Sequence, residues 1–213
     1  MSAPILIMGA TSGIGQCAMT EAVGRGLSVR AFGRSADKLE PHPLVEPFVG
    51  DARNPEDVAR ALKGVRAVVY ALGITERLAM LWEEETVFSQ TTHVLLDEMG
   101  KSDVTRLVVV TGFGAGRSSE AMSWIERTGH RAVLGKPYAD KGRQEAMICA
   151  SDVDWTIVRP VILTKGPRSD KYRVLRDPKA WRNGLISRAS VAHYLIDAIE
   201  QGLDRRADVV LAR

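Results

Sequence analysis

The stretch Ala3-Pro-Ile-Leu-Ile-Met-Gly-Ala-Thr-Ser-Gly-Ile-Gly15-Gln passes from an apolar run into three glycines, Gly9, Gly13 and Gly15, and then into a segment that favours a helix. A strand, a tight glycine turn and a helix in this order build a binding site for a dinucleotide pyrophosphate. Gly9 can take backbone angles that a side chain would forbid, Gly13 lets the chain approach the phosphates, and Gly15 lets the helix pack close to the strand. The helix N-terminus then offers unpaired N–H groups and a partial positive charge to the anion.

The glycine spacing is G-x-x-x-G-x-G, and a glycine-rich turn in another kind of α/β protein is the alternative interpretation. The turn starts at Gly9, directly after an apolar run, which is where a nucleotide-binding turn belongs. This position favours the dinucleotide site.

The composition indicates a globular protein and argues against several classes of function. The chain has 213 residues, 45% of them hydrophobic, and we expect a single domain over residues 1–213 with a sizeable core. The net charge is +3, but the basic residues are dispersed, so we expect no nucleic-acid partner. Cys17 and Cys149 form no C-x-x-C pattern, which argues against a metal site and a disulfide framework. No apolar run approaches about 18 residues, so we expect no membrane association and a cytoplasmic location.

Strand and helix patterns alternate almost to the end of the chain. After the first helix, strands are predicted at 27–32, 45–49, 65–72, 106–110, 154–158 and 208–211. Helices are predicted from Asn54-Pro55 onward and at 86–99, 136–151 and 190–201. This rhythm predicts an α/β fold, a doubly wound parallel sheet in three αβα layers. Gly166 to Asp177 interrupts the rhythm and is predicted as a loop or hairpin, so residues of about 160–190 would form a small substrate-side region.

Ligands of such sheets bind at the carboxyl ends of the strands, so the residues just past each strand are the candidates. Arg34 follows the second strand, at the position that faces the adenosine ribose. An acid there would favour NAD, whereas an arginine suits the 2′-phosphate of NADP by charge and bidentate hydrogen bonding. We therefore expect NADP rather than NAD, with a solvated surface arginine as the alternative. Asp51 follows the third strand, where its carboxylate can accept from the adenine amino group or cap a turn.

The ends of the fourth and fifth strands carry further candidates. Ala71-Leu72-Gly73 is small enough for the backbone to pass along the cofactor, although an ordinary strand-ending glycine explains it as well. After the fifth strand a catalytic hydroxyl is expected; Thr111 has one and Gly112 does not. Phe113 and Trp124 are candidates for lining the pocket.

Tyr138 and Lys141 are three positions apart and share a helix face, so they can form a proton-transferring pair. In the alternative, Tyr138 lies before the helix and Lys141 alone contacts the cofactor. Pro160 is predicted to end the pairing of the sixth strand, with the following backbone near the nicotinamide. Arg159 is a candidate for a structural role, pairing with acids beneath the site.

Several segments together resemble a known family. Gly9-Ala-Thr-Ser-Gly-Ile-Gly15, Asp51, Lys141 with Glu145, and Ser151-Asp-Val-Asp-Trp-Thr-Ile-Val-Arg-Pro160 resemble the atypical short-chain dehydrogenases/reductases of the NAD(P)H-binding, NmrA-like type. Within that group the sequence is most similar to the biliverdin reductase B / flavin reductase branch, from about residue 4 to 201. The resemblance implies a Rossmann-type fold and NADP(H) as the cofactor.

By position, the resemblance implies cofactor contacts at Gly9, Thr11, Ser12, Gly13, Ile14, Gly15, Arg34, Asp51, Ala52, Ala71, Leu72, Gly73, Thr111, Lys141, Pro160, Val161 and Ile162. Our hypothesis gives catalytic roles to three residues. Lys141 orients the nicotinamide ribose, while Thr111 and Tyr138 polarise the acceptor.

Two departures from the family pattern bear on this hypothesis. Thr111-Gly112 stands where many relatives have a serine, and the Y-x-x-x-K motif is absent. Hydride transfer to a planar flavin, quinone or bilin needs mainly orientation, and solvent can supply the proton. The first hypothesis is therefore an NADP(H)-dependent oxidoreductase acting on a small planar or carbonyl acceptor, as a monomer or small homo-oligomer.

Two other functions remain as alternatives. One is a non-catalytic NADP(H)-sensing protein, which the two departures favour. The other is a sugar-nucleotide epimerase or dehydratase, although about 50 residues after the sixth strand leave little room for a sugar-nucleotide domain.

Overall fold

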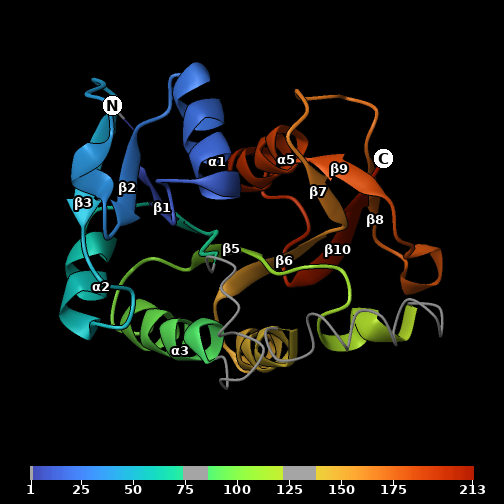
Figure 1. Cartoon of the computed structure of the whole chain (residues 1–213). Helices are drawn as coiled ribbons and strands as arrows, with labels where there is room; N and C mark the ends of the chain where they lie inside the picture. Colours follow the sequence, from blue (N-terminus) through green and yellow to red (C-terminus); the bar gives the residue numbers. More distant parts are fainter. Residues whose placement is uncertain (1, 74–85, 122–137) are drawn as a thin grey trace.

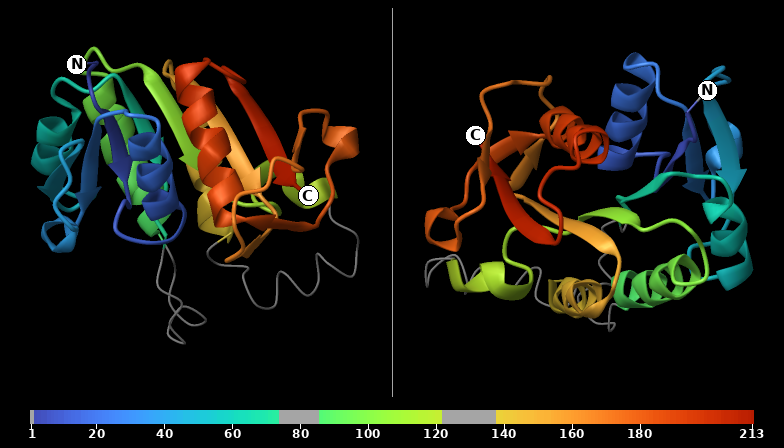
Figure 2. Two further views of the ribbon diagram at one scale, coloured as in Figure 1. Left: turned by 90° about the horizontal axis from the view of Figure 1, so that it is seen from above. Right: turned by 180° about the vertical axis from the view of Figure 1, so that it is seen from behind.

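The computed structural model describes residues 2–73, 86–121 and 138–213, and these form one central sheet covered by helices on both faces. Helices α1 (Gly13–Gly24) and α5 (Arg188–Glu200) lie on one face, while α2 (Pro55–Leu62), α3 (Val87–Met99) and a helix over residues 138–150 lie on the other (Figure 1). Figure 2 shows the same three layers from above and from behind. The eight strands are, in spatial order, β3 (Val45–Val49), β2 (Val29–Gly33), β1 (Ile5–Met8), β4 (Ala67–Tyr70), β5 (Arg106–Val110), β6 (Asp154–Pro160), β10 (Ala207–Ala212) and β8 (Arg173–Leu175).

The sheet is doubly wound and parallel, as predicted, except that β8 pairs antiparallel with β10 at one edge. Strands β1, β4 and β5 are buried at every position, since helices cover both of their sides. Each face has its own apolar core, one toward α1 and α5 and the other toward α2 and α3. The predicted three-layer α/β fold is confirmed, and the ends of the second and fourth strands differ from the prediction by one or two residues.

The region of residues 160–190 contains short strands that the sequence did not indicate. Strand β7 (Ile162–Thr164) pairs in parallel with β9 (Leu185–Ser187) in a separate two-stranded sheet. The segment Gly166 to Asp177, predicted as a loop or hairpin, contributes β8 to the main sheet. A strand of three residues is too short to produce a recognisable alternation of apolar and polar positions.

Pro160 does not end the sixth strand, so that prediction is wrong. Strand β6 runs through Pro160, which is in register with Leu211 of β10. Proline is tolerated here because its nitrogen faces the segment just past β5, which ends at Val110, and does not face β10, with which β6 is still paired. The amide of Thr111 donates to Val158 O, so a parallel ladder would next direct the amide of residue 160 at Thr111 O. Proline has no N–H, and that carbonyl is left for another donor.

Local signals set the helix ends. Asn54 caps α2, its side chain accepting a hydrogen bond from the amide of Glu56 at 3.0 Å, and Pro55 is the first helical residue, as predicted. Gly100 follows α3 directly. The helix predicted at 136–151 is observed over 138–150, and residues 136–137 lie outside the described part of the chain.

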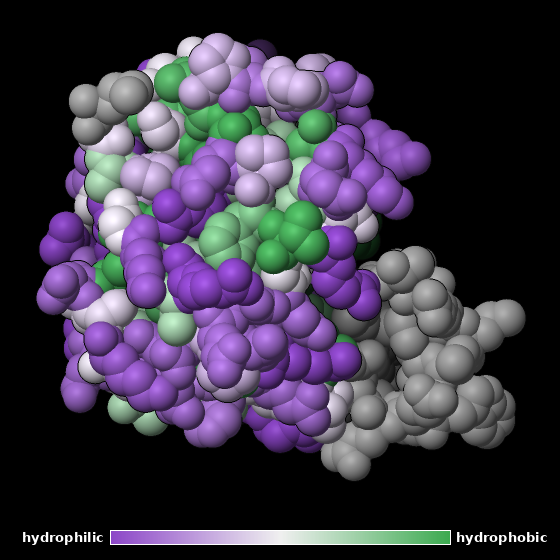
Figure 3. Space-filling view, turned by 90° about the vertical axis from the view of Figure 1, so that its left-hand side faces the viewer, coloured by the Kyte–Doolittle hydropathy of each residue, from purple (hydrophilic) through white to green (hydrophobic). Residues whose placement is uncertain are grey.

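Strand β3 forms the free edge of the sheet opposite β8. It carries the exposed residues Glu46 and Pro47, and Arg30 of β2 donates to Glu46 at 2.9 Å. A charge and a proline on an edge strand discourage pairing with another chain. Figure 3 views the molecule from this side and shows a largely hydrophilic face. Within the described residues, none of the helices has both the length and the apolar character needed to cross a membrane.

Candidate functional site

The glycine turn connects β1 to α1, as predicted, and two of its glycines are required by close backbone packing. Gly9 has a φ of +86°, and a Cβ atom there would lie 2.6 Å from the carbonyl oxygen of Ala71. A Cβ at Gly15 would overlap the carbonyl oxygen of Gly9. The start of α1 is therefore held against the ends of β1 and β4. Gly13 differs, because a Cβ there would meet nothing within 4 Å, so the space beside it is open.

The N-terminus of α1 is available to an anion. Ser12 is the N-cap residue, but its side chain makes no capping hydrogen bond, and the first turn contains no acidic residue. The first amides of a helix have no partners within the helix. Thr11 lies beside these amides and packs against Gly33, where a Cβ would lie 3.4 Å from Thr11 Cγ2, while Ile14 packs partly buried against the core. Unpaired donors beside an open space fit the pyrophosphate of a dinucleotide.

Arg34 lies next to this turn, since it follows Gly33 at the end of β2. Its side chain is exposed, and within residues 2–73, 86–121 and 138–213 no hydrogen bond or ion pair engages it. Arg30, four residues earlier, is committed instead, donating to the carbonyl oxygens of Ala61 and Lys63 at 2.9 and 2.7 Å. Of these two arginines, Arg34 is thus the one whose side chain, within the described residues, is free to meet a phosphate.

Asp51 has the turn geometry that the sequence left as one of two interpretations. Its Oδ1 accepts a hydrogen bond from the amide of Arg53 at 2.9 Å, and its own amide donates to Asp57. The neighbouring Ala52 is buried. Contact of Asp51 with adenine stays a prediction.

Ala71, Leu72 and Gly73 continue β4 at the same edge of the sheet. The amide of Ala71 donates to Met8 O at 3.0 Å, and Ala71 O packs against Gly9 as described above. The end of β4 therefore lies directly beside the glycine turn.

Lys141 is buried at the carboxyl end of β5. Its Nζ donates to Thr111 O at 2.8 Å, which is the carbonyl that Pro160 leaves without a partner. The ammonium group also lies 5.0 Å from the ring centre of Phe88 and 5.3 Å from that of Tyr138. Burial lowers the pKa of Lys141 from 10.5 to about 8, and the charge of Glu145 acts in the opposite direction.

Tyr138 belongs to the helix rather than preceding it, so the structure brings the predicted Tyr/Lys pair together. Its hydroxyl packs against Gly112, where a Cβ atom would lie only 2.8 Å from Oη. Burial raises the pKa of Tyr138 above its usual value, which keeps the phenol protonated at neutral pH. The glycine at position 112 thus creates the space that the Tyr138 hydroxyl occupies.

The Thr111 hydroxyl is not free to donate a proton. It donates to Glu145 Oε1 at 2.6 Å, and the side chain is buried. A hydroxyl whose hydrogen is engaged in this way can only accept a further hydrogen bond. The catalytic roles expected of Thr111, Tyr138 and Lys141 stay predictions, and the hydrogen bond to Glu145 counts against Thr111 as the proton donor.

Arg159 has the structural role that the sequence suggested. It is 2% exposed and donates through Nε and Nη2 to the two oxygens of Glu145, at 2.9 and 2.7 Å. Its Nη1 binds Asp208, which also binds Arg117. Burial alone would raise the pKa of Asp208, but the hydrogen bond from Arg117 and the charge of Arg159 hold it below its usual value. We name the four side chains of Arg117, Glu145, Arg159 and Asp208 the ionic network.

Asp140 is a buried carboxylate that the sequence reasoning missed. Its Oδ2 accepts from the amides of Phe88 and Ser89 at 2.8 and 3.2 Å, so it caps α3 from another helix. A capping residue usually precedes its own helix, and Asp140 lies about fifty positions further along the chain, where no local signal marks it.

Pro160 lies beside the segment that follows β5, because the amide of Phe113 donates to Pro160 O at 3.0 Å, while the amide of Val161 donates to Leu211 O of β10 and that of Ile162 to Gly184 O. Contact of these three residues with the nicotinamide stays a prediction. Phe113 itself is 5% exposed and belongs to the core on the α1 and α5 side, and its expected place in a pocket wall stays a prediction. Trp124 lies outside the described residues. Ile162, at 58% exposure, is a large apolar side chain open to solvent at this edge.

Comparison with solved structures places this arrangement among nucleotide-binding folds. The anaerobilin reductase ChuY of Escherichia coli is 22% identical, with a TM-score of 0.81 over 98% of this chain and 96% of that one. A short-chain dehydrogenase/reductase of Veillonella parvula, solved in complex with NADP, is 17% identical, with a TM-score of 0.83 over 100% and 95%. At these identities the likeness shows the fold.

Sequence comparison gives a shorter match and a family. The 3-beta-hydroxysteroid dehydrogenase of Mycolicibacterium neoaurum is 33% identical over 72 residues, which are 34% of this chain and only 20% of that dehydrogenase. A family model described as NAD(P)H-binding matches residues 9–202, from the first glycine of the turn to two residues past the end of α5. The chain therefore belongs to the NAD(P)H-binding family and has the fold of its atypical short-chain dehydrogenases/reductases.

Proposed function

We propose that this protein is an NADP(H)-dependent oxidoreductase that passes hydride to a small planar or carbonyl acceptor, such as a flavin, quinone or bilin. The observation that carries the proposal is the buried pair of Tyr138 and Lys141 at the end of β5, on the same sheet edge as the glycine turn. The solved neighbour described as an anaerobilin reductase supports the reductase activity, and the neighbour in complex with NADP supports the cofactor.

The residues at this edge fit the parts of the dinucleotide in order. The amides at the start of α1 would hold the pyrophosphate, Arg34 the 2′-phosphate, and Asp51 the adenine. Residues 160–190 would contribute the acceptor side. When bound, the reduced nicotinamide supplies the hydride.

Lys141 and Tyr138 would handle the proton that a carbonyl acceptor takes up together with the hydride. Lys141 is fixed by its hydrogen bond to Thr111 O and by the two aromatic rings, which keeps an ammonium group beside the Tyr138 phenol. Tyr138 is protonated at neutral pH, so its hydroxyl can donate a proton to a carbonyl acceptor as the hydride arrives. For a flavin or bilin acceptor, solvent can supply the proton instead.

The cofactor assignment is tested by comparing NADPH and NADH. In Arg34→Gln, the dissociation constant for NADPH should rise about tenfold or more, because a charge-assisted hydrogen bond to the phosphate is lost, while that for NADH stays the same. Lys63→Gln is the matched control, since it removes one exposed charge at the far end of α2. An unchanged ratio of NADPH to NADH affinity in Arg34→Gln would contradict the assignment.

The activity is tested with NADPH and a panel of flavins, quinones and bilins. The wild type should oxidise NADPH with at least one acceptor, and Tyr138→Phe should lower kcat for carbonyl acceptors more than for flavins.

One observation favours a second candidate, a non-catalytic NADP(H)-sensing protein. The hydroxyl at the end of β5 is engaged by Glu145, and Gly112 carries no side chain. Binding of NADPH without reduction of any acceptor in the panel would favour this candidate.

A further inference from the structure

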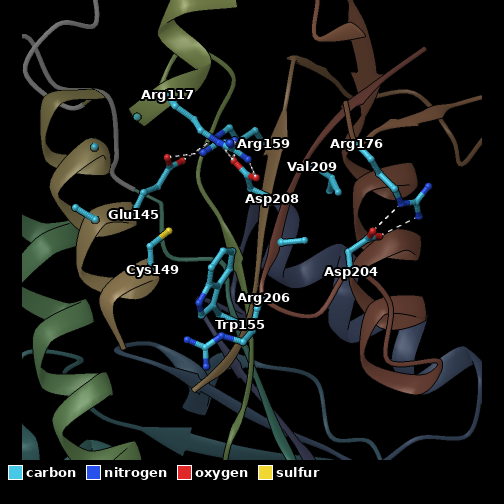
Figure 4. Close-up of a pocket in the computed structure, with 14 residues that line it drawn as sticks. Arg117, Glu145, Cys149, Trp155, Arg159, Arg176, Asp204, Arg206, Asp208 and Val209 are labelled. Atoms are coloured by element: carbon cyan, nitrogen blue, oxygen red, sulfur yellow. Dashed lines mark hydrogen bonds and ion pairs between the residues drawn. The ribbon is translucent and has the colours of Figure 1, made fainter. Parts of the chain in front are cut away.

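A second site lies away from the strand ends, on the face of β6 and β10 that the helix over residues 138–150 leaves partly open. It is a pocket of about 640 Å³, a size typical of small-molecule sites. Figure 4 shows Arg117, Glu145 and Cys149 on one wall, Asp204 and Arg176 on the opposite wall, and Trp155 with Arg206 below.

The carboxylates of the ionic network have little capacity left for further hydrogen bonds. Glu145 accepts from the Thr111 hydroxyl and from Nε and Nη2 of Arg159. Asp208 accepts from Arg159 and through both oxygens from Arg117. Each carboxylate therefore has three donors, two or more of them charged.

The opposite wall repeats this pattern. Asp204 accepts from Nε and Nη2 of Arg176, at 2.6 and 3.0 Å, and from the Tyr194 hydroxyl. Arg206 donates through Nη2 to the carbonyl of Ser151 at 3.1 Å. The third carboxylate of the pocket is thus also saturated.

Unused hydrogen-bond donors remain on the arginines. Among the described residues, no hydrogen bond engages Nη1 of Arg117 or of Arg176, and these side chains are 57% and 58% exposed. Four arginines line the pocket, against the three carboxylates Glu145, Asp204 and Asp208. Free donors and an excess of positive charge select a ligand with an anionic acceptor group.

The turn that leads into β10 is held in an unusual backbone conformation at this pocket. Asp204 and Arg206 have φ values of 49° and 50°, and they are the non-glycine residues with positive φ in the described part of the chain. This conformation is unfavourable for a residue with a Cβ atom, and such residues often cluster at ligand sites. Both residues line the pocket.

We propose that this pocket binds a small molecule with a flat apolar body and one carboxylate or phosphate group. The anionic group meets the free Nη1 donor of Arg176, and the flat body lies against Trp155 with Ala207 beside it. The site is independent of the dinucleotide edge, since no residue expected to contact the cofactor lines it.

The test uses naphthoate, naphthyl phosphate and the neutral naphthamide, titrated into the whole protein by calorimetry without nucleotide. At least one of the two anions should bind with one molecule per chain, about tenfold or more tighter than naphthamide. Binding of naphthoate alone identifies a carboxylate site, and binding of naphthyl phosphate alone identifies a phosphate site. Equal binding of naphthamide, or no binding of either anion, overturns the proposal.

Variants locate the site. Arg176→Gln should weaken binding of the anion about tenfold, and Arg176→Lys should restore part of it. Arg205→Gln is the matched control. Arg205 is 65% exposed and lies between the pocket residues Asp204 and Arg206 in the sequence, but it does not line the pocket. This variant should bind the anion as the wild type does. A saturating concentration of NADPH should leave the binding in place. If Arg176→Gln binds normally, or NADPH displaces the anion, the ligand occupies a different site and the proposal is wrong.

Discussion

Replacing Lys141 with methionine removes a buried positive charge and should change how the stability of the protein depends on pH. Burial lowers the pKa of Lys141 from 10.5 to about 8, so the folded state holds this proton less tightly than the unfolded chain does. Below pH 8 both states carry the proton, and the full cost of burying the charge is present. Between pH 8 and 10.5 the folded state has released the proton and the unfolded chain has not, so stability rises with pH in this window.

The magnitude follows from the size of the pKa difference. At about 1.4 kcal/mol per pKa unit, the buried charge costs about 3 kcal/mol at neutral pH, and raising the pH from about 7 to about 9.5 relieves roughly 2 kcal/mol of this cost. Lys141→Met removes the cost, but it also leaves Thr111 O without a donor, which costs about 1–3 kcal/mol. The relief of the buried charge and the loss of the donor to Thr111 O nearly cancel at neutral pH. The change of the free energy of unfolding with pH is therefore the quantity that separates the wild type from Lys141→Met.

Urea unfolding at about pH 7 and about pH 9.5 measures this quantity, and the tyrosines and cysteines that begin to titrate in this range are the same in the wild type and in the variants. The wild type should gain roughly 2 kcal/mol over this range relative to Lys141→Met. Lys101→Met is the control, since Lys101 has a side chain 68% exposed, and it should follow the wild type. Equal pH dependence in the wild type and Lys141→Met would refute the reasoning.

Two glycine substitutions test the close packing at the site. Gly15→Ala places a Cβ atom against Gly9 O and should lower the free energy of unfolding by about 3 kcal/mol or more. Gly24→Ala, which has open space around it in the same helix, should change this free energy by less than about 1 kcal/mol. Similar urea unfolding curves for the two variants would contradict the close packing of Gly15 against Gly9. Gly112→Ala should cost about 1–3 kcal/mol by displacing the Tyr138 hydroxyl, and Tyr138→Phe in the same chain should recover part of this loss. A double variant no more stable than Gly112→Ala would show that another contact limits position 112.

The fold could be predicted because its signals are local. Strands β4 and β5 are apolar runs since both faces are covered, and the sequence Asn54-Pro55 marks the start of α2 by itself. Strand β8 could not be found, since its three residues take their conformation from pairing with β10, more than thirty positions away. Pro160 misled the prediction because its effect depends on which neighbour its missing N–H faces, and only the three-dimensional arrangement decides that.

The sequence was enough to predict which residues lie at the edge of the sheet that forms the site, but it did not predict which side chains hydrogen-bond to one another there. Strand ends are visible in the sequence, so the glycine turn and Lys141 could be placed at one edge. The engagement of Thr111 by Glu145, 34 residues away, depends on tertiary packing and has no sequence signature. The same is true of Asp208, which binds Arg159 across 49 residues.

The gap that Pro160 leaves in the β5–β6 ladder ties two distant positions together. Any other residue at 160 would direct an N–H at Thr111 O, where it would compete with the buried Lys141 for space and for the acceptor. Pro160→Ala should therefore be tolerated better when position 141 is also changed to an uncharged residue. The proline and the lysine therefore act as one structural unit, in which the side chain of Lys141 supplies the donor that the backbone of Pro160 lacks.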